Sequence, residues 1–446
     1  MKKFFLLTTV FLITAFLNAQ EDIDATRRDI VRFGTETELA ALLQQLREEG
    51  TDSLDNEIIA LVSNTVNQSI LTVAFNFFGE REKGGLDERA IVALEERFDE
   101  NNETVLAAID YLGRIGSWEG LPVLREVLES EERRFLNNTI RALGRVGGAL
   151  GGRDANDMAE YLIGFYEERD LEPGNARELI IALGTNGSGA AVDFLSDIAG
   201  NTDGGQFLRI SALESLSQIG DQRGVDAVLA AVSATEPHIR AAAIAALGPF
   251  SGQAVDATIL DAFRDSFENT RIAAARASRE RKLVAAVPYL RFRATRDESH
   301  SVREHAIRAL GAIANSESMQ ILEELFGERL NPARVRVAAG EMLMEADPNQ
   351  HLNTLIAEMD DAKQRSQTAL YNSFLKILGG TTAGNMETIT RRLMSERGVT
   401  EKSFALEMAA NNKLVSLADE IRAIAEDSNQ ALARRATRTL ERLGIQ

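Results

Sequence analysis

The residues most suggestive of chemistry are cations that gather in one stretch of an otherwise acidic chain. Residues 271–308 hold ten Lys or Arg against four Asp or Glu, a local charge of +6. Guanidinium groups form paired, charge-assisted hydrogen bonds with carboxylates and phosphates. The stretch therefore predicts a patch for an anionic partner, formed by Arg276, Arg279, Arg281, Lys282, Arg291 and Arg293. The alternative is that these cations pair with neighbouring acidic segments or form a solvated face.

A second set of arginines recurs at a fixed position in consecutive segments, at Arg209, Arg240, Arg271, Arg303 and Arg336. An aspartate precedes three of them by six residues, at Asp203, Asp265 and Asp297. One interpretation is a basic stripe that faces a ligand. The favoured one is an internal ladder, in which the aspartates accept hydrogen bonds from helix N-terminal amides or pair with the arginines.

Signals for catalysis and for metal binding are weak. The histidines at 238, 300, 305 and 351 lack the His-Glu-x-x-His spacing that binds zinc. The chain has neither a Gly-x-x-x-x-Gly-Lys-Ser/Thr phosphate loop nor a Gly-x-Ser-x-Gly nucleophile elbow. We therefore expect no catalytic residue, no metal and no cofactor.

A repeated Leu-Gly frame indicates which elements position these side chains. Successive copies lie 31 to 40 residues apart, and the marker residues are Gly79, Gly113, Gly144, Gly184, Ser217, Gly248, Arg279, Gly311, Met344, Gly379, Asn411 and Gly444. A period in this range is typical of stacked supersecondary units. The marker glycine falls in the last turn of a predicted helix, where the missing Cβ would let the next helix approach closely. A second glycine, at 116, 147, 187 and 220, is expected to cap that helix in the left-handed conformation.

Each repeat reads as two amphipathic helices, most clearly at residues 284–296 and 299–314, where apolar residues recur every three or four positions. Eleven residues past the marker, an apolar column is predicted to be buried, at Leu124, Leu195, Val228, Ile259, Leu290, Leu322 and Leu355. Twelve pairs fit within residues 54–443, and an extra helix near residues 36–48 would form an N-terminal cap. The longest interval contains a Gly-rich segment, 147–153, interpreted as a flexible insertion.

Residues 301–311, Ser-Val-Arg-Glu-His-Ala-Ile-Arg-Ala-Leu-Gly, resemble the second helix of a HEAT-like repeat, of the short type also seen in phycocyanin lyases. The resemblance extends over nearly all of the chain after the first nineteen residues. It implies an all-α fold, a right-handed α-solenoid of about twelve helix pairs that serves mainly as a binding scaffold. Such a motif specifies the fold strongly and the function weakly.

The N-terminus and the composition suggest where such a scaffold works. Lys2 and Lys3 precede a short apolar run and a plausible cleavage site at Ala19, so residues 1–19 are predicted to be a signal peptide, residues 20–53 a capping region and residues 54–446 the solenoid. Removing both lysines leaves 47 basic against 68 acidic side chains, a net charge of −21 that disfavours nucleic acid. A periplasmic or secreted monomer without a membrane span is expected.

The favoured function is a non-catalytic scaffold that binds a protein or peptide on a concave face lined by the second helices. Positions three residues before the marker are expected to be exposed there, at Asp110, Arg141, Glu214, Arg276, Arg308, Glu341 and Lys376. The alternatives are a lyase or another enzyme that handles a small molecule or chromophore, and a purely structural envelope component. Base-excising HEAT-like glycosylases are a further relative, disfavoured by the export signal and the acidity.

Overall fold

The computed structural model describes residues 23–97 and 101–445, and within these ranges the secondary structure is helical, without strands. The chain divides into two compact units, unit 1 up to Ala231 and unit 2 from Val232. The predicted signal peptide lies outside the described residues. None of the described helices is both long and apolar enough to span a membrane.

The described part of unit 1 begins with a helix at residues 23–33, which the sequence pattern did not predict. Its N-terminal cap region thus contains two helices where one was expected. The following helices are α2 (Glu36–Glu49), α3 (Asp55–Asn64), α4 (Gln68–Glu80), α5 (Asp87–Glu95), α6 (Asn102–Ile115), α7 (Leu121–Glu129), α8 (Arg133–Leu150), α9 (Gly152–Glu167), α10 (Pro173–Asn186), α11 (Val192–Gly200), α12 (Gln206–Ile219) and α13 (Val225–Ala231), with short 3-10 turns at Gly189–Ala191 and Gln222–Gly224.

Unit 2 continues the same alternation, and its 3-10 turns are Val284–Ala286 and Val415–Leu417. Its helices are α14 (Pro237–Ala246), α15 (Gln253–Ala262), α16 (Glu268–Glu280), α17 (Val287–Arg296), α18 (His300–Ile313), α19 (Ser316–Gly327), α20 (Ala333–Ala346), α21 (Pro348–Gln364), α22 (Thr368–Gly380), α23 (Met386–Ser395), α24 (Val399–Asn411), α25 (Ala418–Ala425) and α26 (Gln430–Arg442). In sequence order, α3 to α26 form the twelve pairs predicted.

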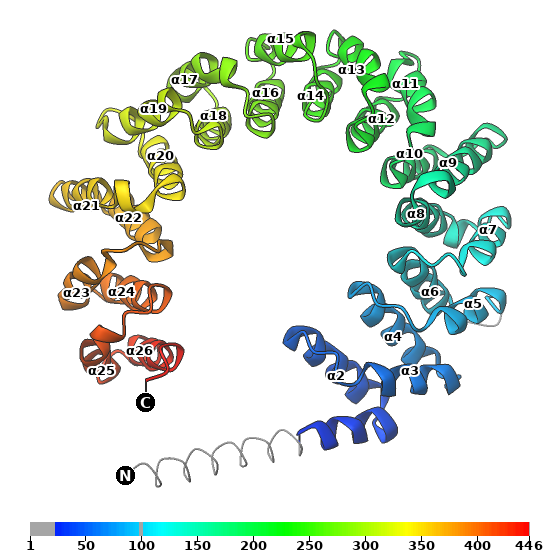
Figure 1. The fold of residues 1–446 in the computed structure, drawn as a ribbon, viewed down its shortest axis with the longest axis horizontal. Helices are drawn as coiled ribbons and strands as arrows, with labels where there is room; N and C mark the ends of the chain where they lie inside the picture. Colours follow the sequence, from blue (N-terminus) through cyan, green and yellow to red (C-terminus); the bar gives the residue numbers. More distant parts are fainter. Residues whose placement is uncertain (1–22, 98–100, 446) are drawn as a thin grey trace. The chain divides into compact units, whose positions relative to one another are not determined.

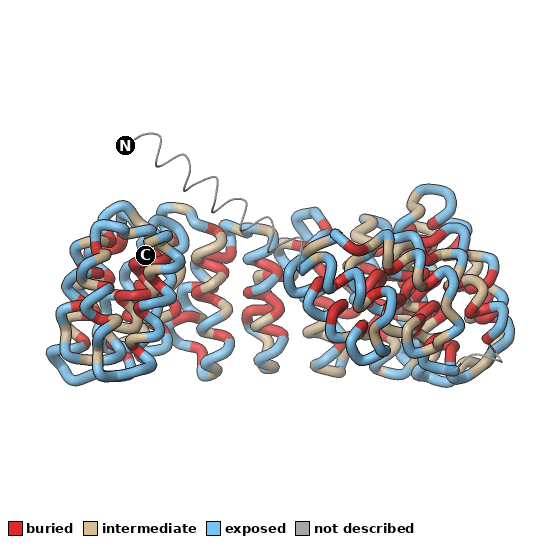
Figure 2. Tube along the Cα trace, turned by 90° about the horizontal axis from the view of Figure 1, so that it is seen from below, coloured by how far each residue is buried: buried red, intermediate tan, exposed pale blue. Residues whose placement is uncertain are grey.

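The even-numbered helices of each unit pack on one another in order, from α2 to α12 in unit 1 and from α14 to α26 in unit 2. We call these series the unit-1 row and the unit-2 row. Each row follows the inner side of its own unit's curve, with the odd-numbered helices behind it (Figure 1). Buried positions recur on pair after pair (Figure 2). The predicted apolar column is confirmed, since all seven of its members are at most 1% exposed.

Three marker glycines of unit 1, Gly113, Gly144 and Gly184, lie where neighbouring helices of the row approach each other, as predicted. The prediction was wrong at Gly444, which follows the end of α26 and has no atom within 4 Å of an added Cβ. A Cβ built on Gly144 would lie 2.6 Å from the Ala182 carbonyl oxygen and 2.9 Å from the Ala182 Cβ. A Cβ on Gly113 would lie 2.7 Å from the Ala142 Cα, and one on Gly184 would lie 2.6 Å from the Ser215 Oγ. The missing side chain therefore sets the distance between successive helices of the row.

The second glycine caps the helix in three of the four predicted places. Gly116, Gly187 and Gly220 have φ values of 66°, 73° and 67°, and the Gly116 N–H donates to carbonyls of the last turn of α6. The prediction was wrong at Gly147, because α8 continues through it to Leu150 and buries it. The Gly-rich segment 147–153 is accordingly the end of α8 and the start of α9, joined at Gly151, where φ is 66°.

Replacing a marker glycine should therefore cost stability through overpacking. We expect Gly144→Ala to lower the free energy of unfolding by about 1–3 kcal/mol, because the new methyl group would press on the Ala182 backbone. The matched control is Gly164→Ala within α9, where no atom of another helix lies within 4 Å of the added Cβ. That change should stabilise the helix by about 0.5–1 kcal/mol. Urea denaturation followed by circular dichroism compares them, and equal midpoints for the two variants would contradict this account.

Candidate functional site

The side chains of the five recurrent arginines donate hydrogen bonds to backbone carbonyls of their own helix pair. The Arg209 Nε donates to the Ala199 carbonyl at 3.1 Å, and the Arg336 Nε donates to the Phe326 carbonyl at 2.9 Å. Both acceptors lie in the last turn of the first helix of the same pair. In this way the second helix satisfies a carbonyl that helix termination leaves without an intrahelical partner.

The other three arginines bind the turn that leads into their own helix. Arg240 donates to the carbonyls of Ala234 and Thr235, at 3.1 and 3.0 Å, and the Arg303 Nε donates to the Asp297 carbonyl at 2.5 Å. Arg271 donates in the same way, to two carbonyls at 3.0 Å each. The recurrence therefore reflects a repeated structural contact that holds the two helices of a pair together.

Two of the three aspartates link successive pairs of unit 2. Arg240 contacts both carboxylate oxygens of Asp265, at 2.8 and 3.1 Å, and Arg271 contacts both of Asp297, at 2.8 and 2.9 Å. Each aspartate also accepts a backbone N–H two residues further on. Asp203 differs, because it is exposed and no ion pair joins it to an arginine within residues 23–97 and 101–445.

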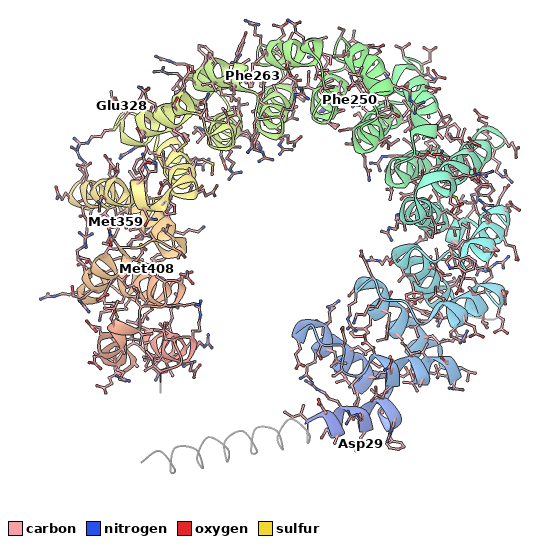
Figure 3. The ribbon with its side chains drawn as sticks, viewed as in Figure 1. Asp29, Phe250, Phe263, Glu328, Met359 and Met408 are labelled. Carbon is pink, nitrogen blue, oxygen red and sulfur yellow. The ribbon has the colours of Figure 1, made fainter. Side chains whose placement is uncertain are left out.

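The six cations of the predicted anionic-partner patch do not share one surface. Arg281 bonds the carbonyls of Gly248 and Phe250 and contacts Asp256 at 2.7 Å. Arg293, on the odd-numbered α17, bonds the Phe263 carbonyl and contacts Asp297 at 3.2 Å. The two phenylalanines that supply these carbonyls are labelled in Figure 3. Arg291, also on α17, pairs with Glu324 at 2.8 Å, so all three of these arginines are occupied by contacts within the chain.

The remaining three patch residues lie together at the end of α16. Arg276 and Arg279 are exposed on this helix, in the unit-2 row, and Lys282 is exposed in the turn that follows. Lys282 has a φ of 47°, and its N–H donates to the Arg279 carbonyl at 3.2 Å, which closes the helix. No ion pair or side-chain hydrogen bond joins any of the three to another part of the described chain. These are the members of the patch that a partner could contact.

The two rows differ in how their charges are matched. In the unit-1 row, Asp110 binds both Arg114 and Arg145, at 2.5 and 2.8 Å, and Arg141 pairs with Glu178 at 2.8 Å, which links α6, α8 and α10 sideways. In the unit-2 row, Arg276, Arg279 and Lys376 are exposed without an ion pair inside the described ranges. The unit-1 row thus neutralises Arg114, Arg141 and Arg145 through ion pairs between its own helices, and the unit-2 row presents three exposed cations that form no ion pair.

Glu341 is an anion of the unit-2 row whose surroundings disfavour its charge. It lines a cavity of about 390 Å³ between α20 and α22, together with Glu345 and Lys376. Burial raises the pKa of the Glu341 carboxyl, and the nearby charges of Arg308 and Lys376 act in the opposite direction. The seven positions predicted to be exposed three residues before a marker, Glu341 included, are at least partly exposed.

A second basic cluster lies outside those predicted from the sequence. Arg434, Arg435, Arg438 and Arg442 are exposed on α26 and line a groove of about 530 Å³ beside Glu407 of α24. We call this the α26 groove. The four-residue spacing of three of these arginines on a helix that carries a single acidic residue, Glu441, is the signal that could have found it.

Comparison with known proteins identifies the repeat. Residues 31–439 match the family model described as Spirochaete HEAT repeat protein. The chain belongs to this family. The HEAT-like fold inferred from residues 301–311 is thereby confirmed, and HEAT solenoids typically present extended surfaces on which other proteins bind.

Solved structures with similar folds share little sequence with this HEAT repeat chain. The crystal structure of Kap121p is 11% identical with a TM-score of 0.45, and that of Kap121p bound to Pho4p is 11% identical with a TM-score of 0.44. Each match covers 94% of this chain and 53% of the other, so the chain spans about half the length of Kap121p. Human deoxyhypusine hydroxylase is 16% identical with a TM-score of 0.26, over 60% of this chain and 100% of the other. No curated protein matches the chain significantly.

A cavity in unit 1 of the HEAT repeat array collects small residues from several helix ends. It measures about 890 Å³ and is lined by the C-terminal ends of α6, α8 and α10 and by the start of α9. Its cationic side chains are Arg114 and Arg145, which both bind Asp110. A small anion in this cavity would therefore compete with a carboxylate that already holds both arginines.

The ion pair between Arg271 and Asp297 should make the fold sensitive to acid. Burial alone would raise the pKa of the Asp297 carboxyl, but hydrogen bonds from Arg271 and from the Ser299 N–H hold it below its usual value. A depressed folded-state pKa gives stability that is present above the unfolded value of about 3.9 and is lost as the pH falls through the folded one.

We therefore expect Asp297→Asn to lower the free energy of unfolding at pH 7 by about 3 kcal/mol, because Arg271 loses its buried counterion. The same change should reduce the loss of stability between pH 7 and pH 3. Asp203→Asn is the matched control and should leave the wild-type pH profile unchanged. Urea denaturation at each pH measures both effects, and identical profiles for the two variants would rule out the assignment.

Proposed function

We propose that this protein is a non-catalytic scaffold that binds another protein or a peptide along the unit-2 row. The observation that carries the proposal is the set of exposed cations on this row, Arg276 and Arg279 on α16 and Lys376 on α22, that form no ion pair in the described chain. The row forms a long, shallow surface, on which affinity arises from a few anchor residues rather than from total contact area. The non-catalytic role rests on the sequence, which shows no nucleophile, metal-ligand or phosphate-loop motif.

Acidic side chains of the partner are the best match for these cations. A guanidinium that has no carboxylate in its own chain can donate two parallel hydrogen bonds to a partner's carboxylate without first breaking an internal pair. Complementary charges also steer the encounter and favour one orientation of the partner. Lys282, in the turn after α16, adds a further cation at the same end of that helix.

We also propose that the protein works outside the cytoplasm, in the periplasm or beyond it. The support is in the sequence: Lys2 and Lys3, an apolar run and Ala19 form a signal-peptide pattern. N-terminal sequencing of protein from the envelope fraction tests this. A mature protein that begins at Gln20 supports export, and an intact Met1 in the cytoplasmic fraction contradicts it.

The scaffold proposal predicts that partner binding depends on the end of α16. The full chain would be purified with its associated proteins from native envelopes, and the stoichiometric partner identified and titrated by calorimetry. We expect Arg276→Ala combined with Arg279→Ala to weaken binding about tenfold or more, equivalent to about 1.4 kcal/mol. Thermal stability should be unchanged, because neither side chain holds another residue in place.

The matched control is Arg264→Ala combined with Arg296→Ala. It removes the same charge from residues at the ends of α15 and α17, where Arg264 pairs with the exposed Asp261 and lies over the Tyr289 ring, 5.3 Å from its centroid. The control should bind the partner as the wild type does. Equal losses in the two double variants would show that net charge matters and not this surface, and a protein that co-purifies with no stoichiometric partner would contradict the scaffold itself.

A further inference from the structure

The α26 groove contains four arginines and one carboxylate, that of Glu407. Arg435 lies 3.3 Å from Glu407, its one acidic partner. Arg434 and Arg442 have neutral acceptors, the Gln430 Oε1 at 3.4 Å and the Asn411 Oδ1 at 3.1 Å. Arg438 forms no ion pair or hydrogen bond with the rest of the described chain. Four guanidinium groups therefore share one carboxylate.

The two arginines of the neighbouring α23 are neutralised more completely. Arg392 contacts both oxygens of Asp360, at 2.8 and 2.9 Å, and Arg391 contacts Glu420 at 2.8 Å. The sequence has 68 acidic and 49 basic residues, so carboxylates are plentiful. The excess positive charge beside α26 is thus a local feature that opposes the charge of the chain as a whole.

The helix that carries these arginines is packed firmly against its neighbours. The opposite face of α26 buries Leu432 and Ala436, and the Thr439 hydroxyl donates to the Arg435 carbonyl at 3.0 Å. The helix packs on both α24 and α25. Because packing on α24 and α25 fixes the backbone of α26, the spacing of the arginines along the helix is set before any partner binds. This reduces the entropy lost on binding.

The spacing of the cations indicates the form of the partner. Arg434, Arg438 and Arg442 follow one another at four-residue intervals, a rise of about 6 Å per step along a helix. Alternate residues of an extended peptide are about 6.6–6.8 Å apart and point to the same side. A segment with carboxylates at alternate positions can therefore place one opposite each arginine.

We propose that the α26 groove binds an extended acidic peptide segment of a partner protein. The inference rests on the proposed scaffold function, because the groove belongs to the same unit-2 row, but it names a contact separate from Arg276 and Arg279. An acidic peptide suits the groove better than a nucleic acid does, since the strongly negative chain repels a long, densely charged polyanion. The carboxylates of a short segment supply the counterions that Arg434, Arg438 and Arg442 lack.

A synthetic peptide tests the groove without knowledge of the partner. The probe is a fluorescent peptide with aspartate at four alternate positions, and its counterpart has asparagine at each of them. Anisotropy titrations with the full chain, at low and at physiological salt, should show binding of the aspartate peptide and at least tenfold weaker binding of the asparagine peptide. Equal binding of the two peptides overturns the proposal.

The variants locate the binding. Arg434→Ala, Arg438→Ala and Arg442→Ala together should reduce affinity for the aspartate peptide at least tenfold, and Arg438→Ala alone should reduce it measurably without loss of any internal contact. The corresponding triple lysine variant keeps the charge but not the paired hydrogen bonds, and its affinity should be intermediate. Circular dichroism verifies that each variant is folded, and unchanged affinity in the folded Arg438→Ala protein overturns the proposal.

Two other occupants of the α26 groove can be tested with the triple alanine variant. Tighter binding of single-stranded RNA than of the peptide, lost in the triple alanine variant, would assign the groove to nucleic acid. Self-association in sedimentation that disappears in that variant would assign it to a second copy of the chain. Either result overturns the peptide proposal.

A matched control separates this inference from the scaffold proposal. Arg276→Ala combined with Arg279→Ala should leave binding of the aspartate peptide unchanged, because those residues lie on α16. If the peptide fails to bind while the native partner still requires Arg276 and Arg279, only the α26 inference falls. If the peptide binds and no partner requires α16, the proposed docking site on α16 falls instead.

Discussion

The close approach of successive helices at the marker glycines is the constraint on which the fold depends. Each approach leaves no space for a Cβ, as the distances from Gly113, Gly144 and Gly184 to the next helix show. The same approach brings the apolar column of each pair against its neighbours and out of contact with water. Because every pair packs mainly on the pairs before and after it, the exposed positions of a row recur at regular places. A regular row is what allows a few unmatched charges to define a docking surface.

Buried charged side chains reinforce this packing between successive pairs of unit 2. Arg271 and Asp297 are 4% and 2% exposed, so both charges have lost most of their hydration. Such a pair contributes little net stability compared with apolar residues of the same size, but loss of one member leaves a buried charge. The paired hydrogen bonds therefore favour one alignment of neighbouring repeats over others. This is a structural role for residues that could otherwise be mistaken for a ligand site.

The sequence predicted the repeat more successfully than the surface. A frame found in twelve copies averages out local irregularities, so the helix pairs, the buried column and the close contacts at Gly113, Gly144 and Gly184 could be placed. Single departures from the period had no such support, and for that reason Gly147 was misjudged and the helix at residues 23–33 was missed. The six patch cations looked equivalent because spacing alone cannot show which arginine reaches a carbonyl, as Arg281 and Arg293 do. Partner choice within the chain depends on side-chain geometry in three dimensions.

The difference between the rows explains why binding is placed on unit 2. A partner that approached α6, α8 and α10 would have to desolvate ion pairs that are already formed, and it would gain only by competing with Asp110 or Glu178 for their arginines. Arg276 and Arg279 on α16 and Arg438 on α26 form no ion pair within the described residues, so a carboxylate from outside adds an interaction without replacing one. An apolar partner would remove water from an unpaired guanidinium without replacing the lost hydrogen bonds. Apolar segments are therefore disfavoured at these positions. The same physical feature thus attracts acidic segments and excludes others, and specificity needs no deep pocket.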